Sequence, residues 1–417
     1  MMYGIIGEKL SHSFSKEIHA KLFDYNYEIC EIAPDKLDEF MTKREFKAIN
    51  VTIPYKERVI KHLDYIDPMA EKIGAVNTVV NKNGRLYGYN TDFLGLRELI
   101  LKNNISLKNK KVLILGSGGT SKTACAVAES LEASEILRVS RSAKDNCISY
   151  EDAQKNHSDA EIIINTTPCG MYPNINASAV EIESFPFLSG VVDAVYNPLN
   201  SLLVCNAKKR GIKATGGLYM LVSQAVYAAE KFTGCEVDKS KTDEIYKQML
   251  AGKQNLVLIG MPACGKSTIG KRLATELNMQ FVDTDELIVK TAGKSIPEIF
   301  SERGEKGFRE IESQAVLEAA KLQHTVIATG GGAVLKEENV RLLSQNGRIY
   351  FIDRPLSFLT ATADRPLSSS RADLEKRYKE RYSIYCKSCH KRITPSENIA
   401  KNVTMIKEDF LNENTCH

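Results

Sequence analysis

The feature that most constrains the fold of this chain is an apolar run, NLVLI, that leads directly into the stretch GMPACGKST at residues 260–268. Gly260 to Ser267 match the pattern GxxxxGK[ST] in full, after an expected strand and before an expected helix. In that context the glycines let backbone N–H groups turn toward a phosphate, and the helix N-terminus adds positive charge. The pattern therefore predicts a nucleotide-binding α/β domain.

Two side chains of this loop have separate expected tasks. Lys266 reaches the β- and γ-phosphate oxygens of the nucleotide, and the Ser267 hydroxyl is placed to bind Mg²⁺. The sequence after the loop lacks the NKxD-type motif with which a GTPase reads guanine, so we expect ATP with Mg²⁺. The loop residues expected to contact ATP are Ala263, Cys264, Gly265, Lys266, Ser267 and Thr268.

A second glycine-rich turn, LILGSGGTSKTA, occupies residues 113–124. It also follows an apolar strand and opens a helix, so it can place a pyrophosphate at a helix N-terminus. The next strand ends near Ser140, where an NAD-selective site carries an acid for the ribose 2′-hydroxyl, but this chain continues with Arg141. A guanidinium flanked by hydroxyls suits a 2′-phosphate, which favours NADP. The expected NADP contacts here are Gly116, Ser117, Gly118, Gly119, Thr120, Ser140, Arg141 and Ser142.

The length of 417 residues, at about 150 residues per domain, predicts two or three domains. Apolar strands alternate with helix-like stretches, and the strands from residue 110 onward lack polar alternation, which is typical of parallel sheets covered on both faces. The pattern restarts after a boundary near residues 252–255. We therefore predict an α/β protein with three parts: an N-terminal substrate domain at 1–100 with a return helix near 218–250, a Rossmann-type NADP domain at 101–217, and a P-loop domain like the nucleoside monophosphate kinases at 254–417.

Composition sets further limits on function. The formal charge of +4 is small for this length, so we expect no nucleic-acid partner. No apolar run approaches the roughly 18 residues of a membrane span, and no basic segment with a long apolar stretch opens the sequence. The ten cysteines follow no disulfide framework. These features predict a cytoplasmic enzyme of small molecules, and they leave its oligomeric state open.

Residues 386–390, CKSCH, spell the CxxCH pattern of haem attachment. Haem attachment of this kind requires export, which nothing else in the sequence predicts. The segment is also basic and rich in tyrosine, as in a helix. We therefore expect a helix in which Cys386 and Cys389 are incidental, rather than a haem or zinc site.

Residues at three points after the phosphate loop indicate what kind of molecule accepts the phosphoryl group. Asp283 and Asp285 follow a strand, so one carboxylate can help to hold Mg²⁺, directly or through water, while the other meets hydroxyls. Arg309 supplies a guanidinium, and the triple glycine at 330–332 lets backbone approach a ligand closely. Carboxylate, guanidinium and bare backbone together favour a small acceptor that bears hydroxyls and a carboxylate.

Residues of about 255–410 resemble shikimate kinase over their whole length. The phosphate loop, FVDTDEL, GFREIE, the triple glycine, DRPL and RYSIYCK stand in the order of that family. The resemblance implies that Asp285 engages the ring hydroxyls and acts as base toward the 3-hydroxyl, that two arginines clamp the substrate carboxylate, and that Arg365 belongs to a lid and meets the ATP phosphates. The implied shikimate contacts are Asp285, Arg309, Gly331 and Arg381.

In the upstream half, Lys56 follows a strand and a proline in NVTIPYK, and Asp92 stands at the start of a helix in GYNTD. A lysine and a carboxylate are suited to move a proton on and off an oxygen while hydride moves at the adjacent carbon. A lone lysine is usually solvated, so this pairing alone does not decide its role.

Residues of about 1–250 resemble shikimate dehydrogenase throughout. SHSFS, NVTIPYK, GAVN, GYNTD, the glycine turn, NTTPCGM, DAVY and GLYMLVSQ stand in the family's order. The resemblance implies that Ser13 and Ser15 bind the substrate carboxylate, and that Lys56 is the acid/base, with Asp92 keeping it oriented. It also implies that Tyr196 and Gly217 lie near the substrate and the nicotinamide. The implied partners of the ring oxygens are Thr52, Asn77, Asp92 and Gln224.

The two resemblances together predict a bifunctional enzyme that reduces 3-dehydroshikimate with NADPH and phosphorylates the resulting shikimate with ATP and Mg²⁺. Two alternatives remain at this point. One is a dehydrogenase half tuned to quinate with NAD, for which an acid is expected in place of Arg141. The other is a nucleotide-binding protein in which one half only regulates the other, although both Lys56 and Lys266 are present.

Overall fold

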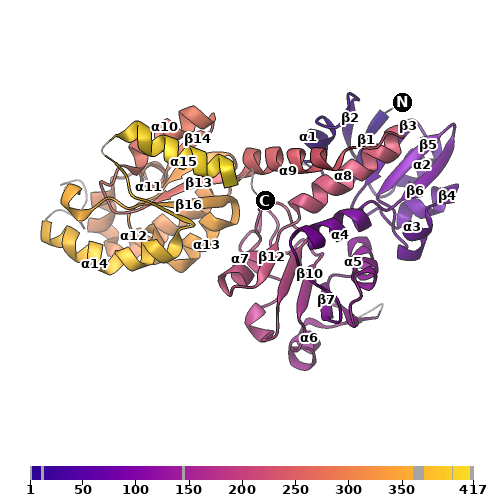
Figure 1. The fold of residues 1–417 in the computed structure, drawn as a ribbon, viewed down its shortest axis with the longest axis horizontal. Coiled ribbons are helices and arrows are strands. Elements are labelled where there is room, and N and C mark those ends of the chain that lie inside the picture. The colour runs from indigo at the N-terminus through magenta and orange to yellow at the C-terminus, as the bar shows by residue number, and fades with distance from the viewer. Residues whose placement is uncertain (1, 11–13, 143–145, 360–370, 397, 414–417) are drawn as a thin grey trace. The chain divides into compact units, whose positions relative to one another are not determined.

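The computed structural model describes residues 2–10, 14–142, 146–359, 371–396 and 398–413 (Figure 1). The chain forms two compact units, Met1–Met249 and Leu250–His417. The division falls within helix α9 (Lys239–Lys253), shortly before the predicted boundary at residues 252–255.

The first unit begins with a mixed sheet of order β2-β1-β3-β5-β6-β4. Strands β1, β2 and β3 pair in parallel, whereas β3–β5 and β5–β6 are antiparallel. The strands are β1 (Met2–Gly7), β2 (Tyr27–Glu31), β3 (Phe46–Val51), β4 (Tyr65–Ile66), β5 (Thr78–Lys82) and β6 (Arg85–Tyr89). The helical elements between them are α1 (Ser15–His19), α2 (Leu37–Lys43), the 3₁₀ turn η1 (Arg58–His62) and α3 (Pro68–Ile73).

The second sheet of this unit is wholly parallel, with the order β12-β11-β10-β7-β8-β9. Its strands are β7 (Lys111–Leu115), β8 (Glu135–Val139), β9 (Cys147–Ile148), β10 (Ile162–Asn165), β11 (Gly190–Asp193) and β12 (Lys213–Thr215). The helical elements are α4 (Asp92–Lys102), α5 (Gly119–Ser130), α6 (Tyr150–Asn156), η2 (Ile182–Ser184), α7 (Leu202–Lys209) and α8 (Leu218–Thr233).

Both faces of this parallel sheet are covered. Along β7, Val112 and Ile114 pack into one apolar cluster, while Leu113 and Leu115 pack into another. In a strand that buries both of its faces, side chains on either side are apolar, and polar residues therefore do not alternate with them. This explains the continuous apolar runs of the sequence. The structure confirms the expected Rossmann-type arrangement of parallel strands and helices.

The second unit holds a parallel sheet of order β14-β15-β13-β16-β17. Its strands are β13 (Asn255–Ile259), β14 (Gln280–Asp283), β15 (Thr325–Ala328), β16 (Gly347–Ile352) and β17 (Lys391–Ile393). The helices are α10 (Lys266–Leu277), α11 (Thr284–Ala292), α12 (Ile296–Ala320), α13 (Glu337–Asn346), α14 (Arg371–Ser388) and α15 (Ile399–Glu413), with 3₁₀ turns η3 (Ala333–Leu335) and η4 (Leu356–Phe358).

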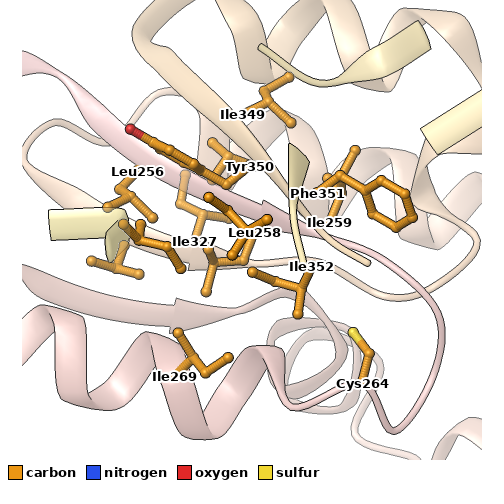
Figure 2. Packing of buried hydrophobic residues seen from close by; sticks show 14 of the residues in the cluster. Leu256, Leu258, Ile259, Cys264, Ile269, Ile327, Ile349, Tyr350, Phe351 and Ile352 are labelled. Carbon is orange, nitrogen blue, oxygen red and sulfur yellow. The ribbon is translucent and has the colours of Figure 1, made fainter. Parts of the chain in front are cut away.

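The core of the second unit forms around its central strand. Figure 2 shows Leu256 and Leu258 of β13 among apolar side chains of the adjoining strands, including Ile327 and Tyr350. This packing fixes the carboxyl end of β13, from which the phosphate loop departs. The sheet thus provides a rigid base for the loop.

The CxxCH segment differs in part from the expectation. Helix α14 includes Cys386 but ends at Ser388, so Cys389 and His390 lie beyond it and the predicted helix is wrong for them. The reason is a pairing with β16, in which the Ile349 N–H donates to His390 Nδ1 at 2.9 Å and the His390 N–H donates to the Ile349 carbonyl at 2.8 Å. Within the described residues, no group of three or more His, Cys, Asp or Glu side chains is arranged to hold a metal ion.

The helices of the described ranges include none with the length and apolar character needed to cross a bilayer.

Candidate active sites

A close ion pair joins two segments of the first unit. Lys56 follows β3, and Asp92 is the first residue of α4; the distance from Lys56 Nζ to Asp92 Oδ2 is 2.6 Å. The two side chains are only 12% and 9% exposed. The ammonium also donates to the Thr120 hydroxyl at 3.2 Å. A largely dehydrated lysine held by a carboxylate is a suitable proton donor or acceptor.

A cavity of about 440 Å³ lies on one side of this pair. Asn77 is held in it by Thr91, whose backbone N–H donates to Asn77 Oδ1 at 2.7 Å and whose hydroxyl accepts from Asn77 Nδ2 at 3.0 Å. The Asn77 amide also reaches Gln224 Oε1 at 3.4 Å. The predicted residues that line this cavity are Ser15, Thr52, Lys56, Asn77, Asp92, Tyr196, Gly217 and Gln224. Most of them are polar, so the cavity suits a small polyhydroxylated acid.

A larger cavity, of about 1200 Å³, also borders Lys56. It is bordered by the glycine turn after β7, where Gly116 has a φ of 123° and a Cβ would come within 2.5 Å of the Thr166 hydroxyl oxygen. Only glycine fits that position. The predicted residues that line this cavity are Gly116, Ser117, Gly118, Gly119, Thr120, Ser140, Arg141 and Ser142.

The residues of the larger cavity fit an NADP molecule. The turn leads into α5, a helix whose first backbone N–H groups have no side-chain cap, as a pyrophosphate site requires. Arg141 is exposed at the cavity edge, where its guanidinium can meet a 2′-phosphate. Gly217 lines the smaller cavity rather than this one, so it borders the substrate side.

A buried polar network connects the walls of both cavities. Asp193, at the end of β11, is fully buried and accepts from Asn165 Nδ2 and from the Val195 N–H, each at 2.9 Å. Ser201 donates to its other oxygen at 2.5 Å. Burial raises the pKa of Asp193 to about 7, although the three donors oppose the shift. The Asn165 carboxamide in turn accepts from the backbone and hydroxyl of Thr167, which borders both cavities.

A cavity of about 590 Å³ in the second unit begins at the phosphate loop. Three loop residues have positive φ, namely Gly260 at 147°, Ala263 at 63° and Gly265 at 99°. Lys266 Nζ donates to the carbonyls of Gly260 and Met261 at 3.0 and 2.9 Å, so the ammonium lies over the loop. The predicted loop residues that line the cavity are Ala263, Gly265, Lys266, Ser267 and Thr268, and Pro262 lies beside them. This arrangement fits the phosphates of ATP.

Cys264 is the exception among the predicted loop residues. Its side chain is 1% exposed and packs in the apolar core below the loop, as Figure 2 shows. It does not line the cavity. Only the backbone of Cys264 is therefore placed to meet a phosphate.

Ser267 and Asp283 are in direct contact. The serine hydroxyl donates to Asp283 Oδ2 at 2.7 Å, while Asp283 Oδ1 accepts from the Asp285 N–H at 2.9 Å and caps helix α11. A hydroxyl and a carboxylate oxygen side by side are the ligand type that Mg²⁺ takes. The residues present thus fit this metal.

The far end of the cavity carries two arginines and a carboxylate. Arg309 donates to Glu312 Oε2 at 2.7 Å and to Glu305 Oε1 at 3.0 Å. Arg381, only 4% exposed, donates to the Gly331 carbonyl at 3.0 Å. The predicted residues Asp285, Arg309, Gly331 and Arg381 all line this cavity together with the phosphate loop.

The triple glycine brings its backbone against these side chains. A Cβ at Gly330 would come within 2.5 Å of Asp285 Oδ1, and a Cβ at Gly332 would overlap the Arg309 guanidinium. Side chains at either position would therefore displace the groups that face the cavity.

Comparisons with known proteins match both units. The "Shikimate dehydrogenase substrate binding domain" family model matches residues 5–79. The shikimate dehydrogenase (NADP(+)) of Clostridium perfringens is 39% identical over 266 residues, which cover 60% of this chain and 98% of that protein. The chain belongs to the shikimate dehydrogenase family. A second relative of the same name, from Caldanaerobacter subterraneus, is 36% identical over 60% of this chain and 96% of its own length.

Solved structures of shikimate dehydrogenases agree with this assignment. Shikimate dehydrogenase 1 of Peptoclostridium difficile is 35% identical, with a TM-score of 0.56 and coverage of 60% of this chain and 97% of that one. A chorismate mutase/shikimate 5-dehydrogenase fusion protein of Clostridium acetobutylicum is 36% identical, with a TM-score of 0.56 and coverage of 60% and 96%. The Thermus thermophilus shikimate 5-dehydrogenase in complex with NADP(H) and shikimate is 30% identical, with a TM-score of 0.53 and coverage of 60% and 99%.

The second unit matches a different family. Residues 262–410 match the "Shikimate kinase" family model, which places a shikimate kinase domain after the shikimate dehydrogenase part. Both resemblances seen in the sequence are thereby confirmed at the level of the family, and so is the P-loop fold.

Two predicted site residues lie outside the described residues: Ser13 of the shikimate dehydrogenase part and Arg365 of the shikimate kinase domain. Three other residues at or behind the cavities, Thr91, Asp193 and Glu312, were not predicted from the sequence. Thr91 and Asp193 stand in the GYNTD and DAVY motifs, and Glu312 in GFREIE. Their positions in the motifs were the available signal, but their contacts depend on the tertiary fold.

Proposed function

We propose that this chain is a bifunctional enzyme that carries out two consecutive reactions on one ring acid. The first unit reduces 3-dehydroshikimate to shikimate with NADPH, and the second unit phosphorylates the 3-hydroxyl of shikimate with ATP. The observation that carries the proposal is that Lys56, paired with Asp92, borders two cavities in one unit, while one cavity in the other unit joins the phosphate loop to Asp285 and two arginines.

In the first unit, Lys56 is the proposed acid and base. When NADPH is bound it supplies the hydride that reaches the ring carbonyl carbon. The Lys56 ammonium gives a proton to the carbonyl oxygen, and Asp92 holds the ammonium in place through the 2.6 Å contact. In the opposite direction neutral Lys56 takes the hydroxyl proton, so the same pair serves both directions.

The remaining polar residues of the smaller cavity hold the substrate in this proposal. Thr52, Asn77 and Gln224 meet the ring oxygens, and Ser15 meets the carboxylate together with Ser13. Asn77 is already oriented by Thr91, so little reorganisation is needed when a hydroxyl group arrives. Tyr196, whose pKa is raised by burial, stays protonated and can donate a hydrogen bond.

In the second unit, the proposed base is Asp285, which accepts the proton of the 3-hydroxyl. Arg309 and Arg381 pair with the substrate carboxylate, since both guanidinium groups border the cavity beside the Gly331 backbone. Lys266 stabilises the negative charge on the transferring phosphoryl group. Ser267 and Asp283 are the proposed holders of Mg²⁺, which supplies further positive charge when bound. Arg365 is proposed to meet the ATP phosphates.

A coupled product assay tests the proposal. The full-length protein is supplied with 3-dehydroshikimate, NADPH and Mg-ATP, and shikimate is separated from its 3-phosphate by chromatography. We expect both products, with NADPH oxidised in proportion. Parallel assays with quinate and with NAD decide between the two substrates and the two cofactors, and a higher kcat/KM for the quinate and NAD pair would contradict the proposal.

Two variants assign each reaction to one unit. Lys56→Ala is expected to abolish NADPH oxidation and to leave phosphorylation of added shikimate unchanged, whereas Lys266→Ala is expected to do the reverse. Loss of both activities in either variant would contradict independent sites. A wild-type protein that binds nucleotides but converts neither compound would be a regulator instead of an enzyme.

A further inference from the structure

The cofactor turn of the first unit touches the proposed catalytic lysine directly. Thr120 is the second residue of α5, immediately after the glycines that border the larger cavity. Its hydroxyl oxygen lies 3.2 Å from Lys56 Nζ. Thr120 also lines the smaller cavity, so it stands at the border of both.

The stem of the lysine is packed against the same turn. A Cβ at Gly119 would lie 3.3 Å from Lys56 Cβ, a tight contact, and 3.5 Å from Lys56 Cδ, an ordinary one, so there is little room for a side chain between this glycine and the lysine stem. The backbone of Lys56 is fixed separately, because its carbonyl accepts from the Val76 N–H at 2.8 Å. The lysine is therefore restrained at its backbone, its stem and its ammonium.

These contacts set the direction of the ammonium protons. An ammonium has three N–H bonds. In the described parts of the chain, Asp92 and Thr120 accept two of them, at 2.6 and 3.2 Å. The remaining N–H direction is then determined by geometry, and Lys56 lines the smaller cavity. Because the Thr120 hydroxyl is neutral, it orients the ammonium without adding charge to the site.

We propose that Thr120 is a positioning residue, whose hydroxyl aims the Lys56 ammonium at the reacting oxygen of the substrate and ties that aim to the cofactor turn. The proposal rests on the proposed dehydrogenase function of the first unit. This positioning role differs from cofactor binding, in which the Thr120 hydroxyl would instead contact the NADP phosphates.

Thr120→Val removes the hydroxyl while it keeps the shape of the side chain, and Thr120→Ser keeps the hydroxyl. The matched control is Thr42→Val, an exposed helix threonine of the same unit whose hydroxyl bonds the Asp38 carbonyl. For each full-length variant, kcat and KM are measured with shikimate and NADP⁺, and NADP⁺ binding is measured by isothermal titration calorimetry.

Because a misdirected proton-transfer group affects the chemical step in either direction, we expect Thr120→Val to lower kcat by about tenfold or more. Both KM values and the NADP⁺ Kd should stay within about twofold, and Thr120→Ser should restore kcat to within about twofold of the wild type. An unchanged kcat in Thr120→Val, a loss confined to NADP⁺ affinity, or a serine variant as impaired as the valine variant would each overturn the proposal.

A crystal structure of Thr120→Val adds a readout that does not depend on turnover. The Lys56 ammonium is expected to keep Asp92 as its partner and to turn away from its wild-type position. If Lys56 Nζ keeps its wild-type position in Thr120→Val, the proposal is overturned, whichever substrate the first unit uses. Failure of the proposed function is a separate result: in that case the wild-type protein would not oxidise shikimate with NADP⁺.

Discussion

Ser267 and Asp283 share one hydrogen bond of 2.7 Å at the edge of the phosphate loop. The same aspartate caps α11 through the Asp285 N–H, so one carboxylate orients both the proposed metal-binding hydroxyl and the helix that carries the proposed base. The two halves of the phosphoryl-transfer site are thus linked through Asp283.

Replacement of this carboxylate by an amide separates its two tasks. Asp283→Asn keeps an acceptor for the helix cap but loses the negative charge that attracts Mg²⁺. We expect the Mg²⁺ concentration for half-maximal kinase activity to rise by about tenfold or more, with little change in thermal stability. The control is Asp67→Asn, which alters the equivalent cap of α3 in the other unit. An unchanged Mg²⁺ requirement would exclude Asp283 from the metal site.

The two carboxylate partners of Arg309 allow a buried and an exposed ion pair of the same guanidinium to be compared. Glu312 is 2% exposed and Glu305 is 55% exposed, yet both accept from the same guanidinium. A buried charged hydrogen bond is worth about 2 kcal/mol, and an exposed ion pair is worth little. Glu312→Gln should therefore raise the KM for shikimate by about tenfold or more in the kinase assay, with the KM for ATP nearly unchanged. Glu305→Gln should stay within about twofold, and equal effects of the two changes would refute this explanation.

Arg141 is expected to decide the choice between the two nicotinamide cofactors. Arg141→Ala removes the guanidinium proposed to meet the 2′-phosphate. This change should weaken the interaction with NADPH by about 2 kcal/mol and leave the interaction with NADH, which has no 2′-phosphate, unaffected. The kcat/KM ratio of NADPH to NADH should then fall by about 30-fold. Steady-state kinetics with both cofactors measure the ratio. Lys209→Ala, an exposed cation on α7, is the control and should leave it unchanged.

Asp193 predicts a pH dependence of stability. Its pKa is about 7 in the folded protein and about 3.9 in an unfolded chain. Between these values the folded chain keeps a proton that the unfolded chain has lost, so the contribution of Asp193 to the free energy of unfolding falls as pH rises from about 4 to about 7. Asp193→Asn abolishes this change. Its free energy of unfolding, relative to the wild type, should increase from pH 5 to pH 7 and then level off.

Urea denaturation of the full-length protein, followed at the transition that NADP⁺ shifts, measures this difference. The control is Asp159→Asn, because Lys111 lowers the pKa of that exposed carboxylate and places its titration below the tested range. A difference between Asp193→Asn and the wild type that stays flat from pH 5 to pH 8 would show that Asp193 is ionised throughout.

The start of helix α12 offers a test of stability alone. Ser295 and Glu298 form a reciprocal capping box, in which the backbone N–H of each residue donates to a side-chain oxygen of the other. Ser295→Ala should lower the free energy of unfolding of the second unit by about 1 kcal/mol and leave its kinetic constants unchanged. Ser301→Ala, in the interior of the same helix, should cost almost nothing. Thermal melts of both variants compare the two serines.

The sequence revealed the buried strands more readily than the short ones. Strands such as β7 and β13 are continuous apolar runs because they lie in the middle of parallel sheets. Strands β4, β9 and β17 have only two or three residues, and they exist because a longer neighbour pairs with them. Strand β6 follows Asn83 and Gly84, which have φ of 54° and 85° and form the tight turn of a β5–β6 hairpin. The Asn-Gly pair was an available signal.

The candidate sites divide in the same way. Lys266 stands in a motif whose chemistry can be read from residue types and spacing, whereas the roles of Lys56, Asp92 and Asp285 follow from the resemblance to the two families. Glu312 and Asp193 look like ordinary acidic residues in the sequence, because their importance comes from burial and from partners on other strands and helices. The contact of Thr120 with Lys56 joins residues 64 positions apart, and only the packing of the two segments reveals it.

The Gly331 carbonyl accepts hydrogen bonds from Arg381 and Tyr385, both on α14 and at least 50 positions later in the chain. The wall that faces the acid is therefore built from two segments of the chain, and a substitution on α14 that removes either donor would loosen it while the sequence of the phosphate loop stays unchanged.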